Sequence, residues 1–190
     1  MKKTVAGVIA LLTICLCLLA GCADKLPEKP DDADLEFWIA EDVSNVDFSE
    51  YYEIIGWFGA REFYGKGYAP AAVNEDNFAI DPRHYVKYLV TAYPDYSDGG
   101  QYVTRIEITD PSVTVYGINC ESAFDEFDEA MEKHGYEVTH SADVTATGNA
   151  KLTLHTADLG GKAWINLIEN SSERKLVIGV EVSNKNNIVY

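Results

Sequence analysis

An alternation of apolar and charged residues constrains the fold of this chain more than any other feature. In the segment 102–109, Ile106 and Ile108 alternate with Arg105 and Glu107. Successive side chains of a β-strand point to opposite faces, so this strand has one buried face and one face in water. The segment Lys175–Ser183 repeats the pattern, with four aliphatic residues on one face: Leu176, Ile178, Val180 and Val182. These strands predict an antiparallel sheet that is covered on one face.

Further strands are expected before and between these two. Short runs rich in β-branched and aromatic residues predict strands at 36–40, 85–93, 113–116, 151–157 and 163–169. The sequence Ser97-Asp98-Gly99-Gly100 predicts a hairpin turn between the strands at 85–93 and 102–109. Leu159-Gly160-Gly161 predicts the connection between the strands at 151–157 and 163–169. The expected sheet therefore consists of sequential antiparallel strands.

Two segments have apolar residues at the spacing of an amphipathic helix. The first is expected at Asp47–Gly59, where Asp47 and Glu50 can form a capping box and one face carries Phe48, Tyr51, Ile55 and Phe58. The second is expected at Ser122–His134, with Ser122 as the N-cap, Gly135 as the stop signal and an inner stripe of Phe124, Phe127 and Met131. The segment Arg61–Pro82 between the helices is predicted to be a long loop.

The expected fold class is therefore α+β, an antiparallel sheet with two amphipathic helices on one face, in a single globular domain at residues 35–190. The two helices share the apolar spacing 3, 4, 4 at an offset of 76 positions, which suggests tandem strand–helix–strand–strand units at 35–110 and 111–190. An offset of 74 instead aligns the strand at 106–110 with 180–184, and both registers cannot hold for the strands. Two unrelated helices on one sheet are the other alternative.

The N-terminus has the parts of a secretory signal: Lys2 and Lys3, an apolar run, and small residues at its end. Leu19-Ala20-Gly21-Cys22 resembles the lipobox of bacterial lipoproteins. This resemblance implies cleavage after residue 21 and attachment of diacylglyceryl and acyl groups such as palmitate to Cys22. The protein would then be anchored outside the cytoplasm, in the outer leaflet of the inner membrane or in an outer membrane. An uncleaved membrane helix is the alternative. Residues 22–34 are predicted to be a flexible tether.

A second resemblance concerns the folded part. Val115-Tyr116-Gly117-Ile118, followed by Phe124, Phe127, Met131 and Gly135, is similar to the helical signature of β-lactamase-inhibitor-like and small-protein-A-type modules. Those families carry a proline after the glycine, where this chain has Tyr136. The resemblance implies helices packed on one face of an antiparallel sheet, and a function by protein contact.

The net charge and the cysteine content argue against nucleic-acid binding and against an internal disulfide. The formal net charge of −16 argues against nucleic-acid binding, which needs basic patches. Cys120 is the single cysteine after Cys22, so no internal disulfide is expected, and a small buried residue is its expected role.

The sequence contains no catalytic or metal-binding motif. His84, His134, His140 and His155 lack metal-binding spacing, and Asp95–Gly100 does not match an EF-hand loop. His155 is expected to be a packed or edge histidine, and the acids of the second helix a solvated face. The lipid attachment site Cys22 is therefore the one predicted site, with no predicted catalytic, cofactor-binding or metal-binding residue.

The sequence favours a membrane-anchored protein-binding or scaffolding module with an unknown protein partner. Trp57, Phe58, Tyr64 and Tyr68 are either contact residues or part of the core. The alternatives are a cell-envelope hydrolase, or a small-ligand carrier, with a site under the loop at 61–82. An apolar pocket would distinguish the carrier.

Overall fold

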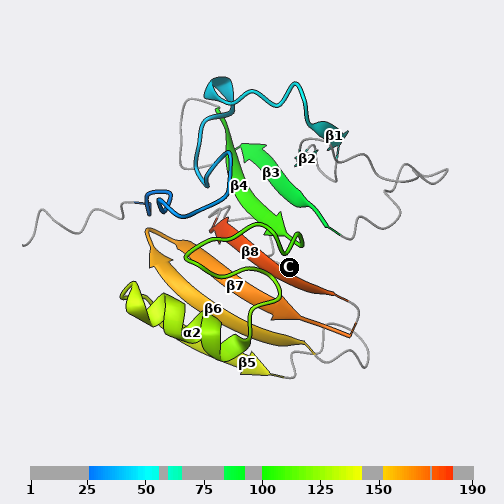
Figure 1. Cartoon of the computed structure of the whole chain (residues 1–190). Helices are drawn as coiled ribbons and strands as arrows, with labels where there is room; N and C mark the ends of the chain where they lie inside the picture. The colour runs from blue at the N-terminus through cyan, green and yellow to red at the C-terminus, as the bar shows by residue number, and fades with distance from the viewer. Residues whose placement is uncertain are drawn as a thin grey trace, which may run out of the picture.

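In the part of the chain that the structure describes, eight strands pair into one antiparallel sheet in the order β1-β2-β3-β4-β8-β7-β6-β5 (Figure 1). The structure is a computed structural model that describes residues 26–55, 60–65, 84–92, 100–142, 152–171 and 173–181. The strands are β1 (Tyr52–Ile55), β2 (Arg61–Tyr64), β3 (Val86–Ala92), β4 (Gln101–Ile108), β5 (Glu137–Ala142), β6 (Thr153–Gly160), β7 (Ala163–Glu169) and β8 (Arg174–Val180).

The β4–β8 pair joins the two halves of the sheet. Ile106 pairs with Ile178 and Ile108 with Leu176, and all four side chains are fully buried. The alternation in the sequence therefore predicted the inner face of both central strands correctly. The opposite face, which was expected in water, is also covered at Glu107 and Val177, which are both buried. The expected hairpin of β3 and β4 and the expected strand at 163–169 are also confirmed.

One α-helix, α2 (Phe124–Lys133), covers the β5–β6–β7 part of the sheet (Figure 1). Its inner residues Phe127 and Met131 are fully buried, as the helical spacing predicted. Gly135 ends the helix with a φ of 84°, a conformation that glycine adopts without a steric penalty. The N-cap is Ala123 instead of Ser122, and its backbone N–H donates to Glu126 Oε2 at 3.0 Å.

The predicted fold class, α+β with two helices, is wrong. The described part of the chain is mostly sheet, with α2 as its one α-helix and a single 3₁₀ turn, η1 (Val43–Asn45). Tyr52–Ile55, where the first helix was expected, is the strand β1 and pairs with β2. The helix-based evidence for two tandem units is lost with that helix.

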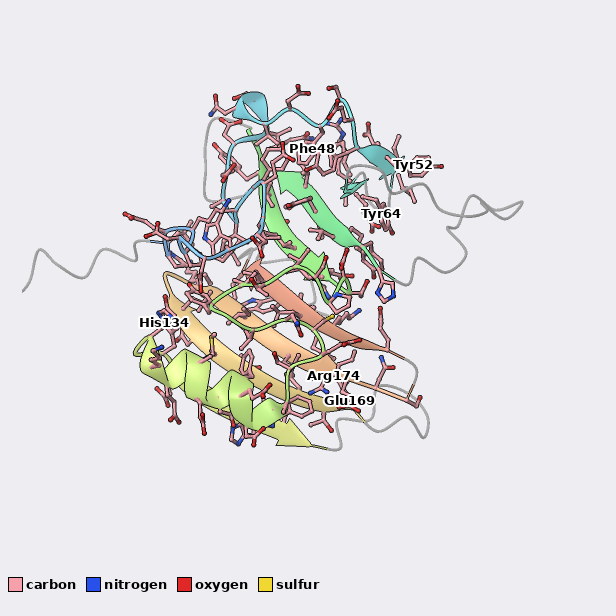
Figure 2. All side chains as sticks on the ribbon, in the orientation of Figure 1. Phe48, Tyr52, Tyr64, His134, Glu169 and Arg174 are labelled. Carbon is pink, nitrogen blue, oxygen red and sulfur yellow. The ribbon has the colours of Figure 1, made fainter. Side chains whose placement is uncertain are left out.

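Aromatic packing explains why the first helical pattern was misleading. Phe48 stacks on Phe63 of β2 with centroids 4.0 Å apart, and it also contacts Phe37, Tyr51 and Tyr88. These side chains are brought together by an irregular segment instead of a helix, and Figure 2 shows Phe48 within this cluster. Spacing alone cannot distinguish the two arrangements, because both place Phe48 and Tyr51 against other aromatic side chains. Ile55, which the helix would have buried, is instead 77% exposed on β1.

The segment before residue 41 packs on the sheet without forming the strand expected at 36–40. The Ala40 backbone N–H donates to the Val103 carbonyl at 2.7 Å, and Val103 N–H donates to the Glu41 carbonyl at 3.0 Å. Glu36–Ala40 itself has no ladder, although Phe37, Trp38 and Ile39 are buried.

Part of the predicted tether also contacts the domain. Trp38 Nε1 donates to the Pro27 carbonyl at 3.0 Å, and Asp34 N–H donates to the Thr114 carbonyl at 2.9 Å. The signal segment and Cys22 lie outside the described residues. No helix in the described part of the chain is long and apolar enough to cross a membrane.

The segment predicted as a long loop begins as a strand. Arg61–Tyr64 is β2, and the rest of the predicted loop after Gly65 lies outside the described residues. Tyr64 is buried and packs edge-on against Tyr85 at 5.5 Å, so it belongs to the core. Trp57, Phe58 and Tyr68 lie outside the described residues.

Candidate functional site

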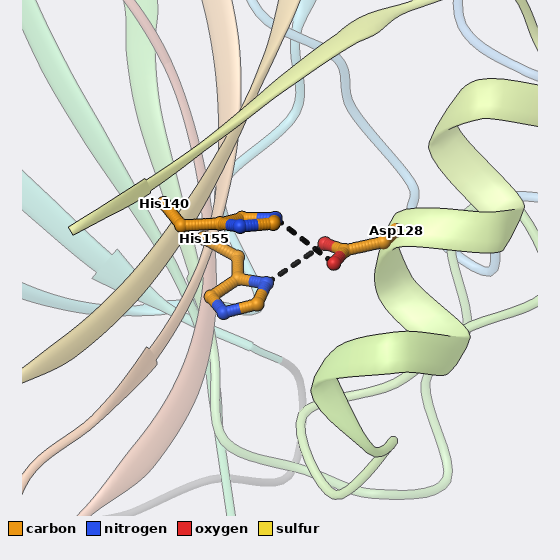
Figure 3. Close-up of side chains that lie close together, drawn as sticks. All are labelled: Asp128, His140 and His155. Carbon is orange, nitrogen blue, oxygen red and sulfur yellow. Dashed lines mark hydrogen bonds and ion pairs between the residues drawn. The ribbon is translucent and has the colours of Figure 1, made fainter. Parts of the chain in front are cut away.

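Three side chains with metal-binding or acid–base chemistry converge beside α2 (Figure 3). His155 Nδ1 lies 2.8 Å from Asp128 Oδ1, and His140 Nε2 lies 2.9 Å from Asp128 Oδ2. The two imidazole rings stack with centroids 4.0 Å apart and an interplanar angle of 27°. The three potential ligand atoms all lie within 4.8 Å of one another. We call these three residues the Asp–His–His cluster.

The pairing of β5 with β6 brings the two histidines together. His140 and His155 are direct partners in the antiparallel ladder. Opposite residues in such a ladder have their Cβ atoms about 4.5–5.5 Å apart and on the same face. A register shift of one residue would place the two rings on opposite faces. The cluster therefore depends on this register.

Helix α2 supplies the carboxylate and fixes its position. Asp128 lies one helical turn after Phe124, whose ring packs against His155 at 4.3 Å. Arg174 holds the start of this helix, with its guanidinium 4.8 Å from the Phe124 ring centroid and Nη2 donating to the Ser122 carbonyl at 2.6 Å. All three members of the cluster thus lie on regular elements, which position side chains better than loops do.

The cluster is closed on one side and open on the other. The side chain of His155 is 15% exposed and that of Asp128 21%, whereas that of His140 on the edge strand β5 is 57% exposed. His155 and Asp128 form the covered side, under Phe124. His140 forms the side that solvent and small solutes can reach.

The local charge is strongly negative. Helix α2 carries five acidic residues and one lysine in ten positions. In the described part of the chain, the ion pairs recorded for Asp128 are with His140 and His155, and none is with a lysine or arginine. The cluster can act as a hydrogen-bonded clamp between helix and hairpin. It can also bind a cation, because carboxylate and imidazole are both metal ligands.

Sequence reasoning missed this cluster for two reasons. The strand β5 was not predicted, so the partner position of His155 was unknown. Asp128 was assigned to a solvated helix face with its acidic neighbours. The available signal was a pair of histidines in two segments able to form a hairpin, but the register decides whether they meet.

A separate surface feature is the strand β1 at the end of the sheet. In the described residues β1 pairs only with β2, and its outer residues Tyr52 and Ile55 are 37% and 77% exposed. Tyr52 projects from the outer side of this strand (Figure 2). An edge strand with exposed apolar side chains can accept an added strand from another chain.

A groove lies between the residues 27–32 and the C-terminal end of α2. It has a volume of about 580 Å³ and is lined by Tyr116, His134, Tyr136 and Leu159 in addition to the residues 27–32. The hydroxyls of Tyr116 and Tyr136 are 3.1 Å apart. Burial, followed by the Tyr136 hydroxyl, raises the pKa of Tyr116 above its ordinary value. His134 packs on Tyr116 at 4.9 Å, so it has an aromatic partner as well as its helix end.

Two buried titratable groups of the described residues, Cys120 and Glu107, lie outside the Asp–His–His cluster. Cys120 is buried, and burial raises the pKa of its thiol to about 11, which disfavours the reactive thiolate. Glu107 is buried on the other face of the sheet with Lys87 at 3.1 Å and Arg105 at 2.9 Å. Cys22, the predicted lipid attachment site, lies outside the described residues.

Comparison with known proteins identifies no relative. No protein-family model matches the chain, and neither the curated proteins nor the solved structures contain a significant match.

Proposed function

We propose that this chain is a lipid-anchored, extracytoplasmic module that works by binding another protein. The observation that carries the binding function is the edge strand β1, where Ile55 is 77% exposed. Such an isoleucine loses contact with water when a partner strand covers it, which favours binding by about 25 cal/mol for each Å² of apolar surface buried. The anchor is supported by the sequence Leu19-Ala20-Gly21-Cys22.

The proposed partner adds a strand to β1. In this mode the main chain of the partner forms ladder hydrogen bonds, and alternate side chains fit the surface beside the edge. Tyr52 and Ile55 lie on opposite faces of β1, and each would gain a cross-strand neighbour from the added strand. The net charge of −16 favours a partner with a basic binding segment and suppresses binding to acidic proteins.

Crosslinking in the native cell envelope, followed by mass spectrometry, tests the binding function. The wild-type protein should capture one stoichiometric partner, and Ile55→Lys should lose it. The matched control is Thr139→Lys, which adds the same charge to an exposed position on the opposite edge strand, β5. Equal capture by both variants, or no partner for the wild type, would contradict the proposal.

The anchor has its own test. Mass spectrometry of the membrane-bound protein should find an N-terminal peptide that begins at acylated Cys22, and Cys22→Ser should release the protein from the membrane fraction. An N-terminus at Met1 with an unmodified Cys22 would show that the lipid anchor is wrong. This result would leave the binding function of β1 open to its separate test.

A further inference from the structure

We propose that Asp128, His140 and His155 bind a divalent transition-metal ion of the zinc class, with at least one coordination position left to water. This proposal is independent of the binding function proposed for β1, because the two features lie at opposite ends of the sheet. It rests on the donor set, the geometry, the local charge and the exposure of the cluster.

The donor set selects the class of metal. Two imidazole nitrogens and one carboxylate oxygen suit Zn²⁺ and its neighbours in the first transition row. Ca²⁺ and Mg²⁺ prefer six or more oxygen ligands, and the cluster offers one carboxylate. Zinc sites with three protein ligands keep water or substrate in the fourth position, whereas structural zinc sites have four protein ligands.

The geometry requires side-chain movements of up to about 1.5 Å, because the three potential ligand atoms lie within 4.8 Å of one another and the widest pair has to close to the spacing of metal ligands. Ligands at about 2.0–2.1 Å from a tetrahedral metal are about 3.3 Å from one another. The nitrogen–oxygen distances of 2.8 and 2.9 Å are those of direct hydrogen bonds, so each contact has to widen by about half an ångström. His140 can make this adjustment because its side chain is more than half exposed on an edge strand.

The proton balance is also simple. In the metal-free cluster Nδ1 of His155 and Nε2 of His140 face the carboxylate oxygens of Asp128, and a ring donates to the carboxylate in the tautomer that carries its hydrogen on that nitrogen. To bind the metal, such a ring carries its hydrogen on the other ring nitrogen instead, exchanged through solvent, so that the lone pair of the first nitrogen faces the metal. This change of tautomer moves a proton within the ring and releases none.

The charge of the site favours a dication. Asp128 shares α2 with four other acidic residues, and in the described residues its recorded ion pairs involve histidines alone. A cation at the cluster therefore lowers the repulsion along the helix. It also joins α2 to the β5–β6 hairpin, so metal binding should stabilise the folded state by mass action.

Calorimetric titration of the full-length protein in detergent, without a polyhistidine tag, tests this site with zinc chloride as the probe. We expect one zinc ion per chain and a rise in Tm on zinc addition. His140→Ala should weaken zinc binding by at least about tenfold. Mutations of residues that only orient the metal ligands already weaken metal binding by about this factor, and His140 would be a ligand itself. Asp128→Asn should have a similar effect. Absence of zinc binding to the folded wild-type protein would overturn the proposal.

Matched controls locate the metal. Glu129→Gln removes a charge from the exposed side of the same helix, and His84→Ala removes an exposed histidine outside the cluster. Both variants should bind zinc as the wild type does. Equal weakening by Glu129→Gln and Asp128→Asn would indicate a diffuse charge effect and would overturn the site. Because His140 is exposed on an edge strand, its alanine variant is expected to fold, and circular dichroism checks this.

Metal identity has two further readouts. Co²⁺ added to the wild-type protein should give visible absorption bands of an imidazole-containing site, and these bands should be lost in His140→Ala. Ca²⁺ should neither raise Tm to the same extent nor displace zinc at equal concentration. Tight competition by Ca²⁺ would contradict the assignment to the zinc class.

Discussion

His140 and His155 stand directly opposite each other in the β5–β6 ladder, and their ring centroids are 4.0 Å apart. Both rings reach the same carboxylate, that of Asp128 on the helix above them. The helix α2 and the β5–β6 strand pair at the edge of the sheet therefore meet at the Asp–His–His cluster. The stability of this region depends on how firmly α2 is held to the sheet, and this dependence can be measured.

Phe127→Ala should destabilise the protein by about 3–5 kcal/mol, the usual cost of removing a large buried side chain and leaving a cavity. Phe127 is fully buried and belongs to the same hydrophobic core as Met131 and Ile165. Urea unfolding followed by circular dichroism measures the change. Glu129→Ala, on the exposed side of the same helix, should stay within about 0.5 kcal/mol of the wild type. Equal effects would mean that α2 is not packed as described.

Gly179→Ala should be destabilising because the indole of Trp164 covers this glycine from the neighbouring strand. A Cβ at Gly179 would lie 2.5 Å from Trp164 Cζ2, which is closer than any van der Waals contact allows. Overpacking of this kind costs about 1–3 kcal/mol. Trp164→Leu in the same chain should recover part of the loss, and a double-mutant cycle of unfolding free energies measures the coupling. An additive result would contradict the contact.

Glu107→Gln should lower stability at neutral pH by about 3 kcal/mol, since it leaves the cations around a buried carboxylate without their partner. Burial raises the pKa of Glu107, but Lys87, Arg105 and Lys175 together lower it further, so the pKa lies below its ordinary value of 4.5. A carboxyl with a lowered folded-state pKa stabilises the fold above its unfolded pKa, and this stability is lost as pH falls through the folded value.

Urea unfolding at a series of pH values below 5 should therefore show a steep loss of stability for the wild type and a shallower loss for Glu107→Gln. Glu53→Gln is the control, because Glu53 forms an exposed pair with Arg61 at 2.6 Å. Pairs of that kind contribute about 1 kcal/mol or less. Similar pH profiles for both variants would show that Glu107 has no special role.

Cys120 should react slowly with alkylating reagents in the folded protein. Its side chain is buried, and the pKa of its thiol is raised to about 11, so the thiolate is scarce at neutral pH. Rates of iodoacetamide labelling, read by mass spectrometry, should rise strongly on denaturation in urea. Fast labelling of the folded protein would mean that Cys120 is accessible, in contradiction to its packing.

Local patterns were sufficient for much of the second half of the chain. Alternation located the inner faces of β4 and β8, because side chains on one face of a strand recur every two residues. It did not show that Glu107 and Val177 on the opposite face are buried too, since that burial comes from other segments of the chain. Helical spacing and a terminal glycine located α2, with Phe127 and Met131 inward and Gly135 at its end. These features depend on neighbours in sequence, so the sequence carries them directly.

The first half of the chain shows where such patterns are insufficient. Phe48 and Tyr51 have helical spacing, yet they are buried by Phe37, Phe63 and Tyr88 from distant segments. Tertiary packing overrides local preference here, because an irregular segment packs Phe48 and Tyr51 on aromatic side chains of distant segments and lets Tyr52–Ile55 pair with β2.

The Asp–His–His cluster also results from tertiary packing and not from a local sequence pattern. The local sequence correctly predicted that His155 lies in a strand and Asp128 on a helix. Which residue lies opposite His155 depends on the β5–β6 register, and that register is set by the fit of the whole hairpin under α2. A contact between residues 128, 140 and 155 has no local signal, because it forms only when three separate elements pack together.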